Sequence, residues 1–476
     1  MTSPTGAEGK KPNVVVVLCD QLRSFSVGCW GDTFVRTPHI DRFASTGFRF
    51  ELGVTSCPAC TPARSTLLAA QHARTCVGSR INEMQPNGTI LGRDDRLKFP
   101  GTTLAEEFKK LGYKTAQIGK WHIDTRPSRL GFDQSLIVRN TYSKGDFIRD
   151  EGEPFGVPGF TADYELAEAD RFFRDNKTGP FFLFYNILSP HMPLLDVPYK
   201  YSRMYDPSRV PLRDNVLRNG KLPADERWFH IYMWETFHNE GSRPVTATAM
   251  PDFTIRDLTA LYYGAVSWTD DLLGELMASL REHGLEDDTI VVFASDHGDM
   301  LGSHHKWDKG QVAEEAIRIP IIYRWPGYIR QGVSKTLLTS LMDIMPTLLD
   351  LCGGTIPEHV QGRSMSGLLL GANGKECLND NFAVIESPLR ELAIRTPTHL
   401  YAVAIDENDG GIESEAYLFY DLRADPYQRH NLVRTNEQAG LAREMRDRLV
   451  EWDRKTPRLR SLKYLPFGGK PIGWDA

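Results

Sequence analysis

The sequence predicts an α/β fold in which helices flank a large, mostly parallel mixed sheet, followed by a smaller C-terminal antiparallel sheet with one helix. Short β-branched and aromatic runs are typical of strands buried on both faces. Helical patterns lie between these runs, and strands that alternate with helices form parallel sheets. After about Gly371 short strand-like runs follow one another instead, which indicates an antiparallel unit.

The elements of the large sheet can be assigned in chain order. Buried strands are expected at Val14–Leu18, Thr115–Ile118, Phe181–Tyr185, Thr289–Ala294 and Ile319–Tyr323. Helices are expected at Leu104–Leu111, Asp257–His283 and Leu337–Leu351. Thr102 or Thr103 can cap the first helix, which stops at Gly112. The second helix ends at Gly284, and Pro346 interrupts the third.

The C-terminal unit is expected to contain four short strands and a helix. These elements are Phe382–Glu386, Leu392–Thr396, Tyr401–Ile405, Tyr417–Tyr420 and the amphipathic helix Ala439–Trp452. Because 476 residues exceed one small domain, we predict a large α/β domain over residues 12–375 and an α+β subdomain over 376–476. Residues 195–256 show no clear period, so long loops over the edge of the sheet are expected there.

The composition restricts the classes of partner. A formal net charge of −6 disfavours a nucleic-acid-binding protein, which usually carries a basic excess. No apolar run is long enough to span a membrane, and the first eleven residues contain no signal core. Seven scattered cysteines without a disulfide spacing indicate reduced thiols. We therefore expect a cytoplasmic protein with no nucleic-acid or membrane partner, and homo-oligomer formation stays open.

Polar groups follow four of the predicted strands. Asp20 follows the first strand, Lys120 and His122 the second, His191 the third, and Asp296 with His297 the fourth. In open α/β sheets the ligand crevice lies beyond the carboxyl ends of the strands, so these groups are expected at one rim. Two aspartates and a histidine suit a divalent cation, although any one of them could be a helix cap or turn residue.

Other rim residues suit an anionic substrate that needs proton transfer. Lys120 and His122 are two apart, so their side chains share a face of an extended segment. His191 lies between Pro190 and Met192-Pro193, which stiffen its segment. Lys309 lies in Trp307–Gly310. Taken singly, each lysine could be a surface charge and each histidine a loop residue.

Cys60-Thr-Pro-Ala-Arg64 gives these groups a common interpretation, because C-x-P-x-R is the pattern of type I sulfatases. The chain from about Pro12 to Leu432 resembles that family, of the alkaline phosphatase superfamily and fold. The motifs in family order are Val17–Gln21, Thr37–Asp41, Cys60–Arg64, Gly119–His122, Ser189–Pro193, Ser295–Asp299, Lys309-Gly310, Glu314-Glu315, Asp343–Thr347, Leu418–Leu422 and Asp425-Pro426.

The resemblance implies a cofactor set. A formylglycine-generating enzyme would oxidise Cys60 to formylglycine, whose hydrate is the nucleophile, and Arg64 would position that hydrate. Asp20, Asp296, His297 and the modified Cys60 would bind one divalent cation. Calcium is expected because most ligands are oxygens, with manganese or magnesium as alternatives.

The resemblance also implies substrate contacts and a reaction. Lys120 and Lys309 would bind sulfate oxygens, and Asn82 is a further substrate-binding candidate. His122 would assist breakdown of the sulfated intermediate, and His191 would face the leaving oxygen. The expected reaction is hydrolysis of a small-molecule or saccharide sulfate monoester to an alcohol and inorganic sulfate.

Two positions depart from the usual family pattern. Cys19 precedes Asp20 where many members have a second aspartate, and this single-aspartate form resembles the choline-sulfatase and phosphonate monoester hydrolase branch. Leu68–Gln71 replaces the usual Leu-Thr-Gly-Arg, but the maturation enzyme reads mainly the Cys60–Arg64 core, so modification is still expected.

Three alternatives stay open at this point. Cys57–Cys60 is a C-x-x-C, which thiol redox proteins place at the first turn of a helix, and Pro62 argues against that arrangement. A non-catalytic sulfatase-like protein would carry an unmodified Cys60. A phosphonate monoester or phosphodiester hydrolase of the same superfamily would replace the Lys and His of the Lys-x-His motif, whereas Lys120 and His122 are retained here.

Overall fold

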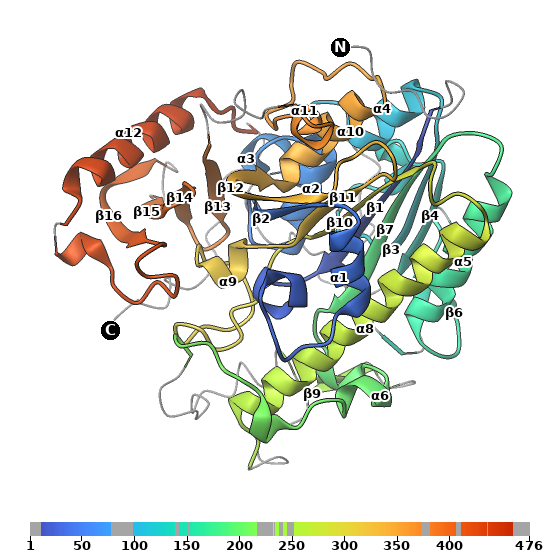
Figure 1. Ribbon diagram of the computed structural model, residues 1–476, viewed down its shortest axis with the longest axis horizontal. Coiled ribbons are helices and arrows are strands. Elements are labelled where there is room, and N and C mark those ends of the chain that lie inside the picture. The colour runs from blue at the N-terminus through green and yellow to red at the C-terminus, as the bar shows by residue number, and fades with distance from the viewer. Residues whose placement is uncertain are drawn as a thin grey trace.

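The structure of the chain is a computed structural model. It describes residues 11–77, 99–138, 142–143, 145–150, 152–216, 232, 234–237, 241–244, 252–372, 381–405, 411–435 and 437–459. Figure 1 shows a large sheet crossed by one long helix, with the C-terminal sheet and its helix beside it. The predicted fold class is confirmed. None of the helices in the described ranges is long and apolar enough to cross a membrane.

The large sheet is mixed, with a parallel centre. In spatial order its strands are β12 (Gly332–Ser340), β2 (Phe48–Val54), β11 (Ile321–Arg324), β10 (Thr289–Ser295), β1 (Asn13–Asp20), β7 (Phe181–Pro190), β3 (Lys114–Lys120), β4 (Gln134–Val138), β5 (Asp146–Ile148) and β6 (Phe155–Gly156). The five strands from β10 to β4 are mutually parallel, and Val16 of β1 pairs with Val292 on one side and Phe184 on the other. Their carboxyl ends therefore meet at one rim.

Helices cover both faces of this sheet, which explains why its central strands are apolar throughout. Along β1, Val15 and Val17 join one core while Val14 and Val16 join the other, as the two-residue period of a strand requires. The first face carries α1 (Pro38–Ser45), α5 (Thr161–Asp175) and α8 (Ile255–Glu282). The second carries α2 (Cys60–Ala69), α4 (Leu104–Lys110), α10 (Ile344–Leu351) and α11 (Ser366–Leu369).

One predicted helix has the expected cap, the second begins two residues before the predicted Asp257, and the third prediction was partly wrong. Thr103 forms a capping box with Glu106 at α4, and Thr254 caps α8 in the same way. The segment predicted as a helix from Leu337 is instead the end of β12, and α10 begins only at Ile344. Pro346 does not interrupt α10, because it lies in the first turn, where backbone N–H groups have no helical partner.

The C-terminal unit contains the predicted four-stranded antiparallel sheet. Its strands are β13 (Ala383–Ser387), β14 (Glu391–Arg395), β15 (His399–Ile405) and β16 (Ile412–Asp421). One face packs against Val312 and Ile317 of the large unit, and α12 (Ala439–Lys455) covers the other. The predicted boundary between 375 and 376 lies outside the described residues and stays a prediction.

The segment 195–256 has little regular structure in the ranges that can be described. It contains α6 (Tyr199–Ser202) and the hairpin of β8 (Trp234–Phe237) and β9 (Gly241–Pro244). Short 3₁₀ turns lie at Leu194–Asp196 and Pro207–Arg209. Loops in this region were predicted, whereas the two-stranded hairpin was not.

Glu165 of α5 is a buried acid beneath the strand that carries Lys120. Its side chain is 2% exposed, its Oε1 has no hydrogen-bond partner, and burial raises its pKa to about 8. Oε2 lies 3.3 Å from where a Cβ on Gly119 would stand. Folding therefore favours the protonated form of this carboxyl group.

We predict that Glu165→Gln removes a pH-dependent loss of stability. The folded pKa lies above the ordinary glutamate value, so this group's stabilisation is complete below pH ~4.5 and is lost as pH rises through about 8. Relative to wild type, the variant should gain a few kcal/mol of unfolding free energy between pH 5 and 8, since each pKa unit corresponds to about 1.4 kcal/mol. Urea unfolding at several pH values measures this gain. Glu444→Gln, at a 57% exposed position, is the control. Parallel pH curves for wild type and Glu165→Gln would contradict the prediction.

Candidate active site

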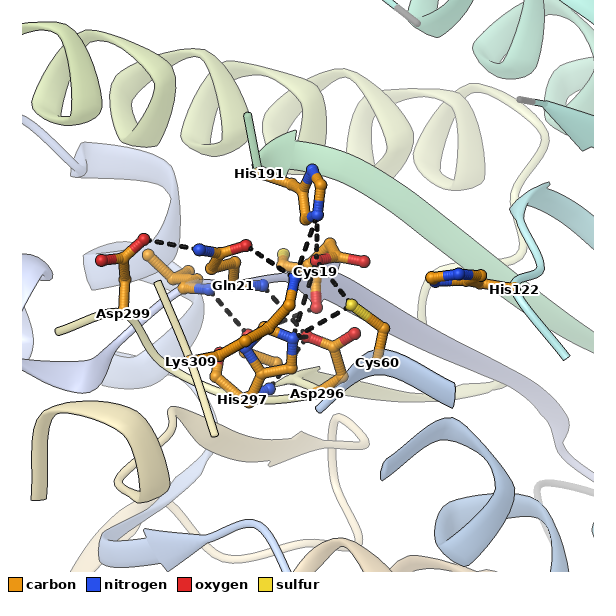
Figure 2. A network of polar contacts seen from close by, with 12 residues as sticks. Cys19, Gln21, Cys60, His122, His191, Asp296, His297, Asp299 and Lys309 are labelled. Atoms are coloured by element: carbon orange, nitrogen blue, oxygen red, sulfur yellow. Dashed lines mark hydrogen bonds and ion pairs between the residues drawn. The ribbon is translucent and has the colours of Figure 1, made fainter. Parts of the chain in front are cut away.

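The polar groups predicted at the sheet rim meet there because their strands are adjacent and parallel. Asp20 is the last residue of β1, and Asp296 follows β10 directly. The Asp296 N–H donates to the carbonyl of Cys19 at 3.0 Å, which holds the two strand ends together. Lys120 ends β3 and His191 follows β7, the next strands across. Figure 2 shows His191, Asp296, His297 and Lys309 gathered around the Cys60 sulfur.

Four of these side chains form a buried group suited to a metal ion. Ligand atoms of Asp20, Cys60, Asp296 and His297 all lie within 4.8 Å of one another. The Cys60 sulfur is 3.2 Å from His297 Nε2 and 3.7 Å from Asp20 Oδ1. His297 Nδ1 bonds the Gly298 carbonyl at 2.8 Å, so Nε2 is the nitrogen turned toward the group. The cysteine sulfur stands here for the oxygen atoms that formylglycine would carry.

Arg64 fixes the two aspartates of this group. Its guanidinium donates to Asp20 Oδ2 at 2.8 Å and to Asp296 Oδ2 at 3.1 Å, and all three side chains are fully buried. It also donates to the carbonyl of Lys120 and to Asn186 Oδ1. The observed role of Arg64 is thus to orient the carboxylates, and it makes no hydrogen bond to Cys60 in the described structure.

The donor chemistry fits a divalent cation. Burial and the neighbouring charge of Asp20 raise the pKa of Asp296 to about 6, although Arg64 opposes the shift. Burial lowers the pKa of His297, but Asp296 and Cys60 outweigh it and raise that pKa to about 9. Both shifts reflect negative charge around Asp296 that the neighbouring cations leave partly uncompensated, so additional positive charge is favoured beside this carboxylate. A cation bound by hard oxygens and one imidazole would supply that charge.

Cys60 lies at the first residue of α2, next to two lysines. Burial would raise the pKa of its thiol, but Lys120, Lys309 and His297 outweigh burial and lower it well below the ordinary value. Lys120 Nζ lies 4.0 Å from the sulfur and 2.6 Å from Asp20 Oδ2. A helix N-terminus adds a further preference for negative charge. The position is therefore electropositive, as an anionic substrate requires.

The helix that begins at Cys60 corrects one argument from the sequence. Pro62 was expected to disfavour a cysteine at the first turn of a helix. Pro62 instead occupies the third residue of α2, where its missing N–H costs no hydrogen bond. The partner cysteine of the C-x-x-C, Cys57, is fully buried, and this burial raises its pKa well above the ordinary thiol value. A buried thiol of this kind does not suit redox exchange.

His191 and Lys309 form a hydrogen-bonded pair above the sulfur. Lys309 Nζ lies 3.1 Å from His191 Nε2. His191 Nδ1 bonds the Met192 carbonyl at 2.6 Å, so this nitrogen carries the proton and Nε2 accepts from Lys309. Burial, Lys120 and Lys309 lower the pKa of His191 to about 4, which keeps the imidazole neutral.

His122 is placed differently from the extended geometry expected of Lys120-Trp121-His122. β3 ends at Lys120, Trp121 turns into the core, and His122 has a positive φ of 52°. The Thr61 hydroxyl donates to the His122 carbonyl, which ties this turn to the start of α2. Neither ring nitrogen of His122 makes a hydrogen bond of full geometry among the described residues, but the ring lies close enough to Cys60 to lower the pKa of that thiol. Asn82, the remaining predicted contact, lies outside the described residues.

The site contains residues that the sequence analysis did not single out. They are Gln21, Asn186, Tyr232, Asp299 and Asp308. Gln21, Asp299 and Asp308 adjoin predicted site residues, and that adjacency was a usable signal. Asn186 lies inside an apolar strand, where a lone amide could have been noticed. Tyr232 comes from a segment without periodicity and gave no signal.

Comparison with known proteins identifies the family. The model of the family described as Sulfatase matches residues 12–354, which is most of the chain. The chain belongs to the sulfatase family. A second model, described as N-sulphoglucosamine sulphohydrolase, C-terminal, matches residues 302–455. This sulfatase is therefore a sulfuric ester hydrolase, and the family resemblance of its motifs is confirmed.

Individual relatives support the same assignment. An ulvan-active sulfatase of Formosa agariphila is 29% identical over 462 residues, covering 92% of this chain and 80% of that protein. A choline-sulfatase of Rhizobium meliloti is 27% identical over 480 residues, covering 93% and 87%. A solved complex with D-glucosamine-2-N,6-O-disulfate superposes with a TM-score of 0.78 at 22% identity, covering 95% and 100%. At that identity, the superposition shows the shared fold. Sulfatases of this family generally use a divalent metal and formylglycine.

Proposed function

We propose that this sulfatase releases inorganic sulfate from a saccharide O-sulfate ester, using formylglycine derived from Cys60 and one divalent cation. The observation that carries the proposal is the position of the Cys60 sulfur inside the buried group of Asp20, Asp296 and His297. A purely structural role does not need a cysteine among two carboxylates and three cationic side chains, and the buried thiol of Cys57 is a poor partner for redox exchange. The maturation enzyme is the partner required to produce the active residue.

Each absent component has a defined chemical contribution. Asp20, Asp296 and His297 would hold the cation, with calcium favoured because most ligands are oxygens; once bound, it acts as a Lewis acid toward sulfate. Hydrated formylglycine offers two hydroxyl groups on one carbon, so one can attack sulfur and the other can later lose its proton to expel sulfate. The protein's own residues supply the rest.

The lysines are placed to neutralise the sulfate oxygens. A sulfate monoester is an anion with a weakly electrophilic sulfur, so attack requires fixed positive charge around its oxygens. Lys120 and Lys309 both lie close enough to Cys60 to lower the pKa of its thiol, and the same charges would act on the ester. His122, whose ring nitrogens make no hydrogen bond of full geometry among the described residues, is available to accept a proton from the second hydroxyl.

His191 and Lys309 are placed to protonate the leaving oxygen. In the resting tautomer His191 Nε2 carries a lone pair, so it can donate only after it receives a proton. Lys309 Nζ is the donor already bonded to Nε2 and is the nearest source of that proton, although the lowered pKa of His191 and the raised pKa of Lys309 oppose the transfer before the leaving oxygen gains negative charge. We therefore assign the pair as one acid, with His191 nearest the alcohol oxygen.

The substrate class is supported by the named relatives. One is active on ulvan, and a structural neighbour was solved with a disulfated glucosamine. A saccharide ester has an alkoxide leaving group, which needs protonation, and the His191–Lys309 pair meets that need. A cytoplasmic location remains a prediction of the sequence.

The first test concerns the nucleophile. When the chain is made together with a formylglycine-generating enzyme, the Cys60 peptide should lose about 18 Da, because a thiol carbon becomes an aldehyde. Release of sulfate from sulfated monosaccharides should require this conversion and should be abolished in Cys60→Ala. Cys57→Ala, which removes the other cysteine of the C-x-x-C, should retain both conversion and turnover. Full activity in Cys60→Ala would show that the nucleophile is assigned wrongly.

The second test concerns the leaving group. General-acid assistance is worth ~10² to 10⁴ in rate, so His191→Ala should lose that factor on sugar sulfates and far less on activated aryl sulfates. Lys309→Ala should slow both classes, because it also binds sulfate. The slope of kcat/KM against phenol pKa measures the difference, with Lys200→Ala, at a 69% exposed position, as control. An unchanged slope in His191→Ala would exclude His191 as the acid.

A further inference from the structure

Gln21 has an amide whose orientation is fixed by charged neighbours. Its Nε2 donates to Asp299 Oδ2 at 2.6 Å and to Asp308 Oδ1 at 2.8 Å. Its Oε1 accepts from Lys309 Nζ at 3.2 Å. Figure 2 shows Gln21 lying between Asp299 and Lys309. We propose that Asp299 is a positioning residue, which acts through the Gln21 amide to hold the Lys309 ammonium in its catalytic place. Asp308 supports the same amide and also pairs directly with Lys309 Nζ at 3.5 Å.

The alternative orientation of this amide is unfavourable at both ends. A flipped amide would turn its carbonyl oxygen toward two carboxylates and its NH₂ group toward an ammonium ion. Buried donors and acceptors that lose their partners cost free energy, and charged partners raise that cost. The side chain of Gln21 is fully buried, so water cannot relieve the conflict. The two acids therefore select the orientation that presents oxygen to Lys309.

The backbone of Gln21 is also held on both sides. Its N–H donates to Asp296 Oδ1 at 3.0 Å, and its carbonyl accepts from the Tyr262 hydroxyl at 2.7 Å. Its φ of 70° is unusual for a residue with a side chain. This turn directs the amide away from β1 and toward Lys309, while Asp20 continues into the metal-binding group.

The hydroxyl of Tyr232 completes a ring of hydrogen bonds that includes Gln21. Its hydroxyl donates to Asp299 Oδ1 at 2.7 Å and accepts from the backbone N–H of Asp308. Gln21, Asp299, Tyr232 and Asp308 are therefore joined in a closed cycle of hydrogen bonds. Tyr232 is 1% exposed, although it comes from the long segment between β7 and α8. The ring fixes the backbone on the N-terminal side of Lys309.

Asp299→Asn tests the proposal because it changes one oxygen to nitrogen at nearly constant volume. Asp299 Oδ1 accepts from the Leu301 N–H as well as from Tyr232, while Oδ2 accepts from Gln21. An asparagine has one acceptor oxygen, which the fixed Leu301 donor retains. Its NH₂ group then faces the Gln21 NH₂ group, so the Gln21 amide must flip or withdraw. Either movement removes the acceptor from Lys309.

The inference rests on the proposed function, and a double-mutant cycle separates the two. Asp299→Asn should lower kcat/KM for sulfate release at least about tenfold in otherwise wild-type protein, but less than about threefold in a Lys309→Ala background. Tyr232→Phe should show the same dependence on Lys309 with a smaller effect. Asp175→Asn, at a 56% exposed position, is the charge-matched control. Formylglycine and metal content are measured for every variant.

A general structural defect in these variants would change kcat/KM in a different way from the loss of Lys309 positioning. If Asp299→Asn and Tyr232→Phe lower kcat/KM by the same factor in both backgrounds, or only in proportion to lost metal or formylglycine, the positioning role is overturned. If wild-type protein releases no sulfate, the proposed function fails instead. In protein with ¹⁵N-labelled glutamine, the Gln21 side-chain N–H signals, identified by their loss in Gln21→Leu, should exchange slowly with solvent and should exchange faster in Asp299→Asn. Equal exchange rates would also overturn the assignment.

Discussion

Two buried carboxylates that face each other across adjacent strand ends constrain the rest of this structure. Asp20 and Asp296 have no exposed side-chain surface, and burying such charges costs several kcal/mol each unless they are paired. Arg64 spans both of them, and Lys120 adds a second cation on Asp20. The same cations leave the Cys60 position electropositive. Metal binding, sulfate binding and nucleophile activation therefore all depend on the same set of buried charges.

The topology of the sheet brings these buried charges together. Because β10, β1, β7 and β3 are adjacent and parallel, residues far apart in the chain reach one rim, although long segments connect these strands. The apolar strands and the helices on both faces make the rim rigid, and rigid elements hold a site more accurately than loops do. The C-terminal sheet is tied to the segment that follows Lys309, since Arg395 of β14 donates to Glu314 through Nε and Nη2.

Many residues of this site could be predicted from the sequence. The same physical reasons explain why other predictions were wrong. Asp20, Asp296 and His191 were predictable because an apolar run that ends in a polar group marks a strand end. The helix expected from Leu337 was wrong because its apolar run continues across the junction of β12 and α10. The backbone is not extended at His122, since the preceding Trp121 turns into the core. The contact of Tyr232 with Asp299 depends on tertiary packing, which no local pattern records.

Metal binding by the formylglycine-containing protein tests the central claim most directly. Calorimetric titration with calcium, checked by elemental analysis, should find one ion per chain in wild type and none in Asp296→Asn. Arg64→Lys should bind it about 10- to 100-fold more weakly, because residues that orient ligands contribute that much to affinity. Arg149→Lys, in an exposed ion pair, should match wild type. An active protein without a divalent ion, or full calcium affinity in Asp296→Asn, would contradict the account.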